Sequence, residues 1–255
     1  RVDRRQRQMC IRDRSSEVQN EMGFLEHLEE LRWRLVRSFI AILIGSALSY
    51  GYIDQILGIL LFPSTTTSNP IVIQSLQVQS MFLIKWFISF ASGFILALPY
   101  LMYQFWQFVA PGLKVKEKKF ALPFVFFAFT SFIAGVLFGY LVIIPFSLEF
   151  FSGVADPQVE NNFSIQYYFS FLTWLLIGAG VIFQLPVVSL VLSTIGILTP
   201  AFMKHYRRHS MVTILILSSF ITPPDPVSML IMSFPLVLLY EISIGVSWLV
   251  NRKRT

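Results

Sequence analysis

Six stretches of this chain are almost entirely apolar, and all but one of them are long enough to cross a membrane. The hydrocarbon core of a bilayer is about 30 Å thick, and a helix spans it with about 20 apolar residues. The sequence therefore predicts an all-α, polytopic membrane protein with six transmembrane helices. They are expected at Leu35–Ile53, Met81–Phe108, Phe120–Phe146, Tyr168–Ile195, Met211–Ile221 and Val227–Val250.

The composition agrees with a membrane protein. Of the 255 residues, 55% are hydrophobic and 13% are charged, whereas a soluble domain carries about 25% charged residues. The chain also has 26 phenylalanines, which a soluble protein has no room to bury. The single Cys10 excludes a disulfide framework within one chain and a cysteine-based metal site.

The chain divides into four parts. Residues 1–14 differ in composition from everything after them, so we expect a non-native or disordered leader, with a basic arm for anionic lipid as the alternative. Residues 15–34 are expected to form a cytoplasmic amphipathic helix. The six-span membrane domain follows at 35–250, and residues 251–255 form a basic cytoplasmic tail.

The last two spans are expected to be short. The run Met211–Ile221 must either extend back to the helix start at Thr199-Pro200 or lie where the bilayer is thin. The prolines of TPPDP (222–226) then separate the two spans as a tight hairpin. Other prolines are expected to kink the spans into a concave wall. They are Pro99, Pro145, Pro186 and Pro235.

Charged residues alternate from loop to loop. The loops at 63–80 and 150–167 contain no lysine or arginine, whereas the intervening loops and the C-terminal tail are basic. Cytoplasmic loops carry the excess of lysine and arginine, so both termini are expected in the cytoplasm. The basic residues are Lys114, Lys116, Lys118, Lys119, Lys204, Arg207, Arg208, Arg252, Lys253 and Arg254.

One acidic stretch, FLEHLEELRWRL (24–35), lies on this basic side of the membrane. On a helical wheel one stripe is apolar: Phe24, Leu28, Leu31 and Leu35. The opposite face carries Glu26, Glu29, Glu30 and Trp33. This face is either a solvated surface with i,i+4 pairs such as Glu30 with Arg34, or a carboxylate surface for a cationic partner. A second acid, Glu117, lies among four lysines in QFVAPGLKVKEKK (107–119), where a local ion pair is the simpler alternative.

Five segments together resemble the TatC family. They are HLEELRWRL (27–35), YQFWQFVAPGLKVKEKK (103–119), FQLPVV (183–188), ITPPD (221–225) and LLYEIS (238–243). This family is the six-span core receptor of the twin-arginine protein translocase. The resemblance implies a receptor for signal peptides with two adjacent arginines. It also implies export of folded proteins, driven by the proton-motive force.

The resemblance implies particular roles for four residues at the cytoplasmic surface. Glu30 and Glu117 match the two acids that contact the twin arginines. Carboxylates suit this role because a planar guanidinium binds a carboxylate through two parallel hydrogen bonds, which lysine cannot do. Phe108 is expected to contact the apolar part of the signal peptide. Arg32 is expected to hold the carboxylates in place.

Two polar residues are expected within the membrane, Gln184 and Glu241. Many family members have a glutamate where this chain has Gln184. A glutamine keeps the hydrogen bonds but does not titrate, so this position cannot carry a proton here. A satisfied packing contact is the alternative. Glu241 can also reach the headgroups. The outer hairpin, Thr222, Pro223, Pro224 and Asp225, is expected to fix a turn first and to contact a partner second.

The implied partners are twin-arginine signal peptides, single-span TatA- or TatB-type proteins, further copies of this chain and the lipid bilayer, with no nucleic acid. The expected location is a bacterial cytoplasmic membrane, or a plastid thylakoid. A small-solute transporter is the alternative, but the chain shows no convincing internal repeat. No motif for an enzyme, a metal or another cofactor is present in the sequence, and a purely structural membrane scaffold remains an open alternative.

Overall fold

The computed structural model describes residues 24–65, 72–110, 121–153, 162–221 and 226–252. Nearly all of them are helical, as apolar segments in a membrane require because their backbone groups must bond internally. The helices are α2 (Phe24–Gly51), α3 (Ile53–Thr65), α4 (Ser80–Val109), α5 (Ala121–Phe138), α6 (Ile144–Gly153), α7 (Ile165–Ile182), α8 (Leu185–Ile195), α9 (Pro200–His205), α10 (Arg207–Ile221) and α11 (Pro226–Arg252). The all-α membrane fold is therefore confirmed.

The count of six spans stays a prediction. Four segments of the described chain are long and apolar enough to cross a membrane: Ser80–Val109, Ala121–Gly153, Ile165–Ile195 and Met229–Arg252. A fifth is formed by α2 and α3 if this pair, bent by 79°, counts as one span. The remaining predicted span, Met211–Ile221, lies in α10, which has only 15 residues. The last span was expected to be short. Instead, Pro235 lies inside α11 without ending it, and that helix runs for 27 residues.

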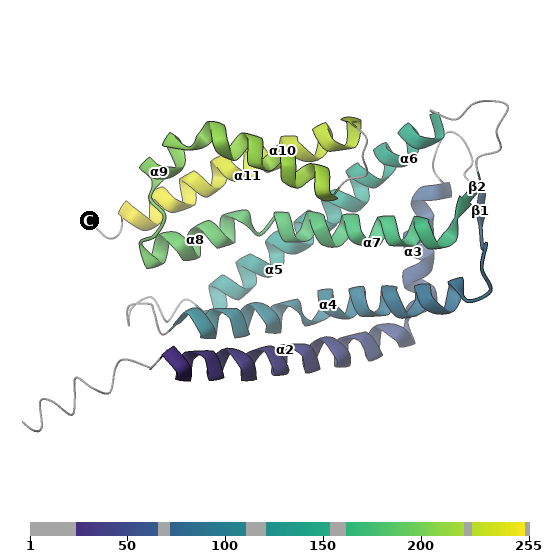
Figure 1. Cartoon of the computed structure of the whole chain (residues 1–255), viewed down its shortest axis with the longest axis horizontal. Coiled ribbons are helices and arrows are strands. Elements are labelled where there is room, and N and C mark those ends of the chain that lie inside the picture. Colours follow the sequence, from purple (N-terminus) through teal and green to yellow (C-terminus); the bar gives the residue numbers. More distant parts are fainter. Residues whose placement is uncertain (1–23, 66–71, 111–120, 154–161, 222–225, 253–255) are drawn as a thin grey trace, which may run out of the picture.

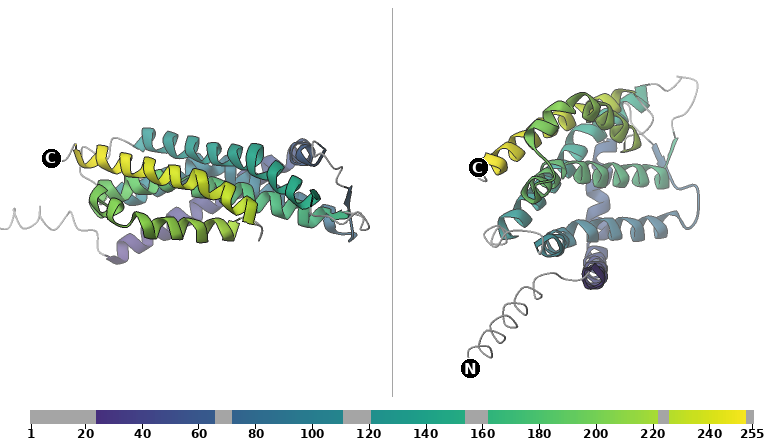
Figure 2. Two further views of the ribbon diagram at one scale, coloured as in Figure 1. Left: turned by 90° about the horizontal axis from the view of Figure 1, so that it is seen from above. Right: turned by 60° about the vertical axis from the view of Figure 1, so that its left-hand side comes forward.

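The helices lie side by side in a curved row (Figure 1). Helix α2 packs along α4, α4 contacts α7, and α8 packs on α11, while α5 crosses behind the row and contacts α4 and α7. The right-hand view of Figure 2 shows α10 with α11 on one side of the molecule and α2 on the other. The start of α2 and the end of α11 lie at the same end of the molecule, which we call the Glu30 end.

A small parallel sheet lies at the opposite end. Strand β1 (Val72–Gln74) pairs with β2 (Asn162–Ser164), with Ile73 opposite Phe163. These strands connect α3 to α4 and α6 to α7, so they tie together two connections that lie far apart in the sequence.

Prolines interrupt the helices in different ways. Pro99 lies inside α4, which continues through it. Pro145 follows a π-helical turn, Gly139–Ile143, that joins α5 to α6. Pro186 lies in the first turn of α8, just after the break between α7 and α8 at Phe183 and Gln184. The prediction that such kinks form a concave wall is untested by these observations.

Glycine allows the close contact between α2 and α4. A Cβ atom added to Gly45 would lie 2.6 Å from the backbone oxygen of Gly93, so any larger residue would push the helices apart. Membrane helices pack without a hydrophobic driving force between them, and close backbone contact through small residues is their usual solution. The candidate functional site lies along this same pair of helices.

Candidate functional site

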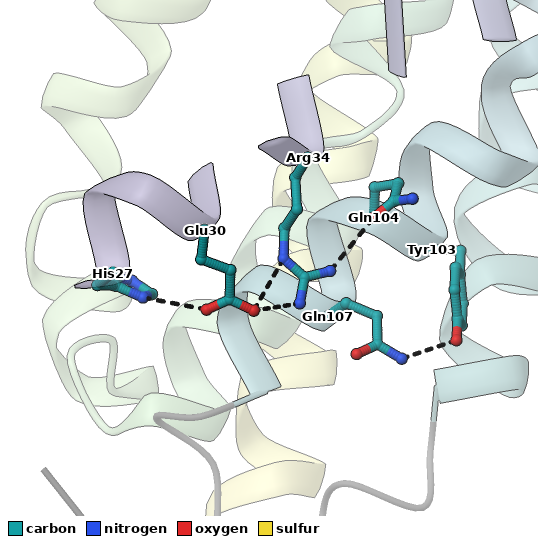
Figure 3. A network of polar contacts seen from close by, with 6 residues as sticks. All are labelled: His27, Glu30, Arg34, Tyr103, Gln104 and Gln107. Atoms are coloured by element: carbon teal, nitrogen blue, oxygen red, sulfur yellow. Dashed lines mark hydrogen bonds and ion pairs between the residues drawn. The ribbon is translucent and has the colours of Figure 1, made fainter. Parts of the chain in front are cut away.

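Three polar residues of α2 face α4 at the Glu30 end (Figure 3). His27, Glu30 and Arg34 are spaced by three and four residues, which places them on one side of a helix. The Nε atom of Arg34 donates to Oε1 of Glu30 at 3.1 Å, and its Nη2 atom donates to the same oxygen. The i,i+4 pair considered from the sequence is therefore present.

Arg34 also joins α2 to α4. Its Nη1 atom donates to Oε1 of Gln104 at 3.2 Å, and Nε2 of Gln104 donates to the hydroxyl of Tyr100 at 2.6 Å. The side chain of Arg34 is only 15% exposed and Gln104 is buried, so this chain of contacts is largely removed from solvent. A guanidinium has donors on both sides of its plane, which lets Arg34 hold Glu30 and Gln104 at once.

The second carboxylate oxygen of Glu30, Oε2, accepts no hydrogen bond from Arg34. Oε2 is buried and has no hydrogen-bond partner among the described residues. The Nδ1 atom of His27 lies 3.7 Å from Oε2, which exceeds hydrogen-bonding distance. Glu30 therefore has one occupied and one unoccupied oxygen.

His27 is stacked on Phe108 at the end of α4. The ring centroids are 4.3 Å apart and the ring planes differ by 12°. Of the four site residues expected at the cytoplasmic surface, the structure thus brings Phe108 close to Glu30 through His27. Arg32 is exposed, and the guanidinium in contact with Glu30 is that of Arg34 instead. Glu117 lies outside the described residues.

The two sides of the helical wheel do not correspond to an inner and an outer face of the protein. Leu28 and Leu35 of the apolar stripe are exposed, at 45% and 61%, whereas Glu30 faces α4. In a membrane the outer surface is itself apolar, so an apolar stripe need not face the protein. Helix α2 is also continuous from Phe24 to Gly51, so no break in the helix marks the boundary expected at residue 34.

The remaining predicted residues lie elsewhere. Gln184 is at the break before α8, where its Nε2 atom donates to the backbone oxygen of Ala128 at 3.1 Å and its Oε1 atom has no partner among the described residues. Glu241 of α11 forms an ion pair with Arg207 of α10 at 2.6 Å, with both side chains about half exposed. The hairpin residues 222–225 lie outside the described residues.

His27 and Gln104 were missed by the sequence analysis. His27 was detectable in principle, because it lies three residues before Glu30 on the same helix. Gln104 has no local signal, since its contact with Arg34 joins residues 70 positions apart.

Comparison with known proteins identifies the family. Residues 26–235 match the family model of the Sec-independent protein translocase protein (TatC). The chain belongs to the TatC family. TatC is a translocase component, not a family of catalytic enzymes.

Proteins named TatC align with this chain over nearly its whole length. The TatC protein of Halalkalibacterium halodurans is 35% identical over 240 residues, which are 92% of this chain and 92% of that protein. The TatC protein of Aquifex aeolicus is 34% identical over 235 residues, covering 91% of this chain and 98% of the relative. A crystal structure described as the twin arginine translocase receptor TatC is similar with a TM-score of 0.78 and 34% identity, and covers 89% of this chain and 100% of that one. The resemblance stated from the sequence is thereby confirmed, and the chain is a multi-pass membrane protein of a protein translocase.

Proposed function

We propose that this chain is the signal-peptide receptor of a twin-arginine translocase, and that Glu30 accepts one of the two arginines. The observation that carries the proposal is the unoccupied Oε2 atom of Glu30. A buried carboxylate oxygen without a donor is costly, so it favours a guest that brings hydrogen-bond donors and positive charge.

The chemistry favours arginine over lysine. A guanidinium presents several donors in one plane and binds a carboxylate in a defined geometry, whereas a lysine ammonium acts as a point charge. A hydrogen bond to a charged group contributes about 1.5–3 kcal/mol, so losing one weakens binding by roughly tenfold or more. Glu117 is proposed as the second acceptor, with Phe108 beside the apolar part of the peptide and Arg34, rather than Arg32, holding Glu30 in place.

The test is binding of a fluorescent twin-arginine signal peptide to the full chain in nanodiscs, beside the same peptide with two lysines. We expect the lysine peptide to bind at least about tenfold more weakly, and Glu30→Gln to weaken the arginine peptide by a similar factor. Glu29→Gln is the matched control, because Glu29 is an exposed neighbour on the same helix. Equal binding of both peptides, together with no effect of Glu30→Gln, contradicts the proposal.

Transport requires further partners. We propose that the receptor recruits TatA- or TatB-type single-span proteins and further copies of itself, in the cytoplasmic membrane of a bacterium, and that the proton-motive force drives export of folded cargo. The hairpin Thr222–Asp225 is proposed as a contact with a partner, on the outer side.

A further inference from the structure

The imidazole of His27 lies next to the atom that a guest arginine would need. Its Nδ1 atom is 3.7 Å from the unoccupied Oε2 of Glu30, and its ring is stacked on Phe108. Yet His27 leaves Oε2 without a hydrogen bond. The imidazole therefore lies beside the acceptor without donating a hydrogen bond to it.

We propose that His27 is a resident substitute for the guest guanidinium, which displaces it on binding. In the bound state one arginine of the signal peptide stacks on the ring of Phe108 and donates to Oε2 of Glu30. This inference rests on the proposed receptor function and assigns it one specificity-determining residue, Phe108, and one residue that competes with the guest, His27.

The shape of the existing stack supports this exchange. An imidazole and a guanidinium are both planar, carry donors at their edge and stack on aromatic faces. The ring planes of His27 and Phe108 differ by only 12°, with centroids 4.3 Å apart, so a flat group already occupies the face of Phe108. A guanidinium in that place would have its edge directed at Glu30, as the edge of the imidazole is now (Figure 3).

The other side of Glu30 is closed to the guest. Arg34 holds Oε1 and is itself held by the buried Gln104 on the neighbouring helix, so displacing Arg34 would break contacts at both ends of its guanidinium. Displacing His27 breaks no hydrogen bond to Glu30, since the imidazole makes none. Exchange at Oε2 is therefore the less costly route.

Phe108 then has a different role from the one that the family resemblance implies. Instead of contacting the apolar part of the signal peptide, its ring recognises the arginine itself. Stacking on an aromatic face favours a planar guanidinium over an ammonium, so Phe108 adds to the discrimination between arginine and lysine.

The experiment uses the full chain in nanodiscs with the twin-arginine peptide and its two-lysine form, and compares four variants. Phe108→Leu keeps an apolar side chain but removes the ring, and we expect the arginine-over-lysine preference to fall about fivefold. Phe108→Trp keeps an aromatic face and is expected to retain the preference. His27→Ala removes the competing ring and is expected to tighten arginine-peptide binding about threefold. Phe105→Leu is the matched control on the same helix, because its ring stacks on Phe124 of α5 rather than on His27.

The outcomes separate this inference from the receptor function itself. If Glu30→Gln weakens binding but Phe108→Leu leaves the preference unchanged, the receptor stands and the stacking role is wrong. If His27→Ala weakens binding or leaves it unchanged, His27 is not a substitute for the guest. If Phe108→Leu and Phe105→Leu lower the preference equally, the effect is general loss of packing and the inference is also overturned.

Discussion

At the scale of residues, the site is defined by one carboxylate, Glu30, whose two oxygens differ in their hydrogen bonding. Its position depends on a chain of contacts that runs through Arg34 to Gln104 and Tyr100. Gln104 is buried and its amide is oriented by two neighbours, so it acts on Glu30 only through Arg34. It is a positioning residue rather than a contact for the guest.

Replacing Gln104 tests this arrangement. Gln104→Leu leaves Nη1 of Arg34 without its acceptor and frees Arg34 to move, so we expect affinity for the twin-arginine peptide to fall about three- to tenfold. Gln107→Leu is the matched control, because Gln107 bonds to Tyr103 on the same helix and not to Arg34. Binding measured in nanodiscs decides the point; equal losses in both variants would show that Arg34 needs no support from Gln104.

The ion pair of Glu241 with Arg207 is more exposed than the pair of Glu30 with Arg34. Both side chains are about half exposed, and an exposed pair contributes between zero and about 1 kcal/mol. Glu241→Gln is therefore expected to leave the thermal unfolding temperature almost unchanged. A large loss of stability would show that this part of α11 is shielded from solvent and headgroups.

At the scale of elements, helix α3 shows how a proline is accommodated. Pro63 lies inside α3 and has no backbone N–H, so the carbonyl of Ile59 loses its usual helical donor. The hydroxyl of Tyr140 donates to that carbonyl at 2.7 Å, and Tyr168 donates to the next one, of Leu60, at 2.9 Å. Tyr140 thus replaces the donor that the proline removed, and Tyr168 adds a second contact that helps to fix the position of α3.

A double-mutant cycle tests this compensation. Tyr140→Phe leaves the carbonyl of Ile59 without a donor and is expected to lower the free energy of unfolding by about 1–3 kcal/mol. In a Pro63→Ala background the new backbone N–H can bond to the same carbonyl, so the cost of Tyr140→Phe should shrink. Thermal or denaturant unfolding in detergent measures both; an equal cost in the two backgrounds would contradict the explanation.

At the scale of the whole molecule, the outer surface is apolar over most of the length of the helices. Large exposed side chains occur on α2, α4, α5, α7 and α11, among them Phe39, Trp86, Phe126, Trp174 and Phe234. A soluble protein does not expose so many, and here the lipid acts as the solvent. The sheet of β1 and β2 lies at one end of this apolar body and the Glu30 end at the other.

The predicted orientation can be tested with two introduced cysteines in a Cys10→Ser background. Val78 is fully exposed between β1 and α4, and Arg208 is exposed near the start of α10. If both termini are cytoplasmic, an impermeant thiol reagent should label Val78→Cys in intact cells and Arg208→Cys only after permeabilisation. The opposite pattern would reverse the orientation and place Glu30 on the outer side.

The sequence by itself determined the class of protein, the approximate positions of the spans and the family. These follow from local properties: runs of apolar residues, alternating loop charges and short motifs, none of which depends on how helices pack. Glu30 and Phe108 were also named in advance, although only the motifs suggested them.

Only the tertiary structure decided which side of α2 meets the protein. In water an apolar stripe faces the core, but in lipid Leu28 and Leu35 lie equally well on the outside, so the wheel of residues 24–35 could not identify the inner face. The close contact of Gly45 with Gly93 sets α2 against α4, and this brings Arg34 to Gln104 and His27 to Phe108. The contacts that leave one oxygen of Glu30 unoccupied join two helices far apart in sequence, and no local pattern encodes them.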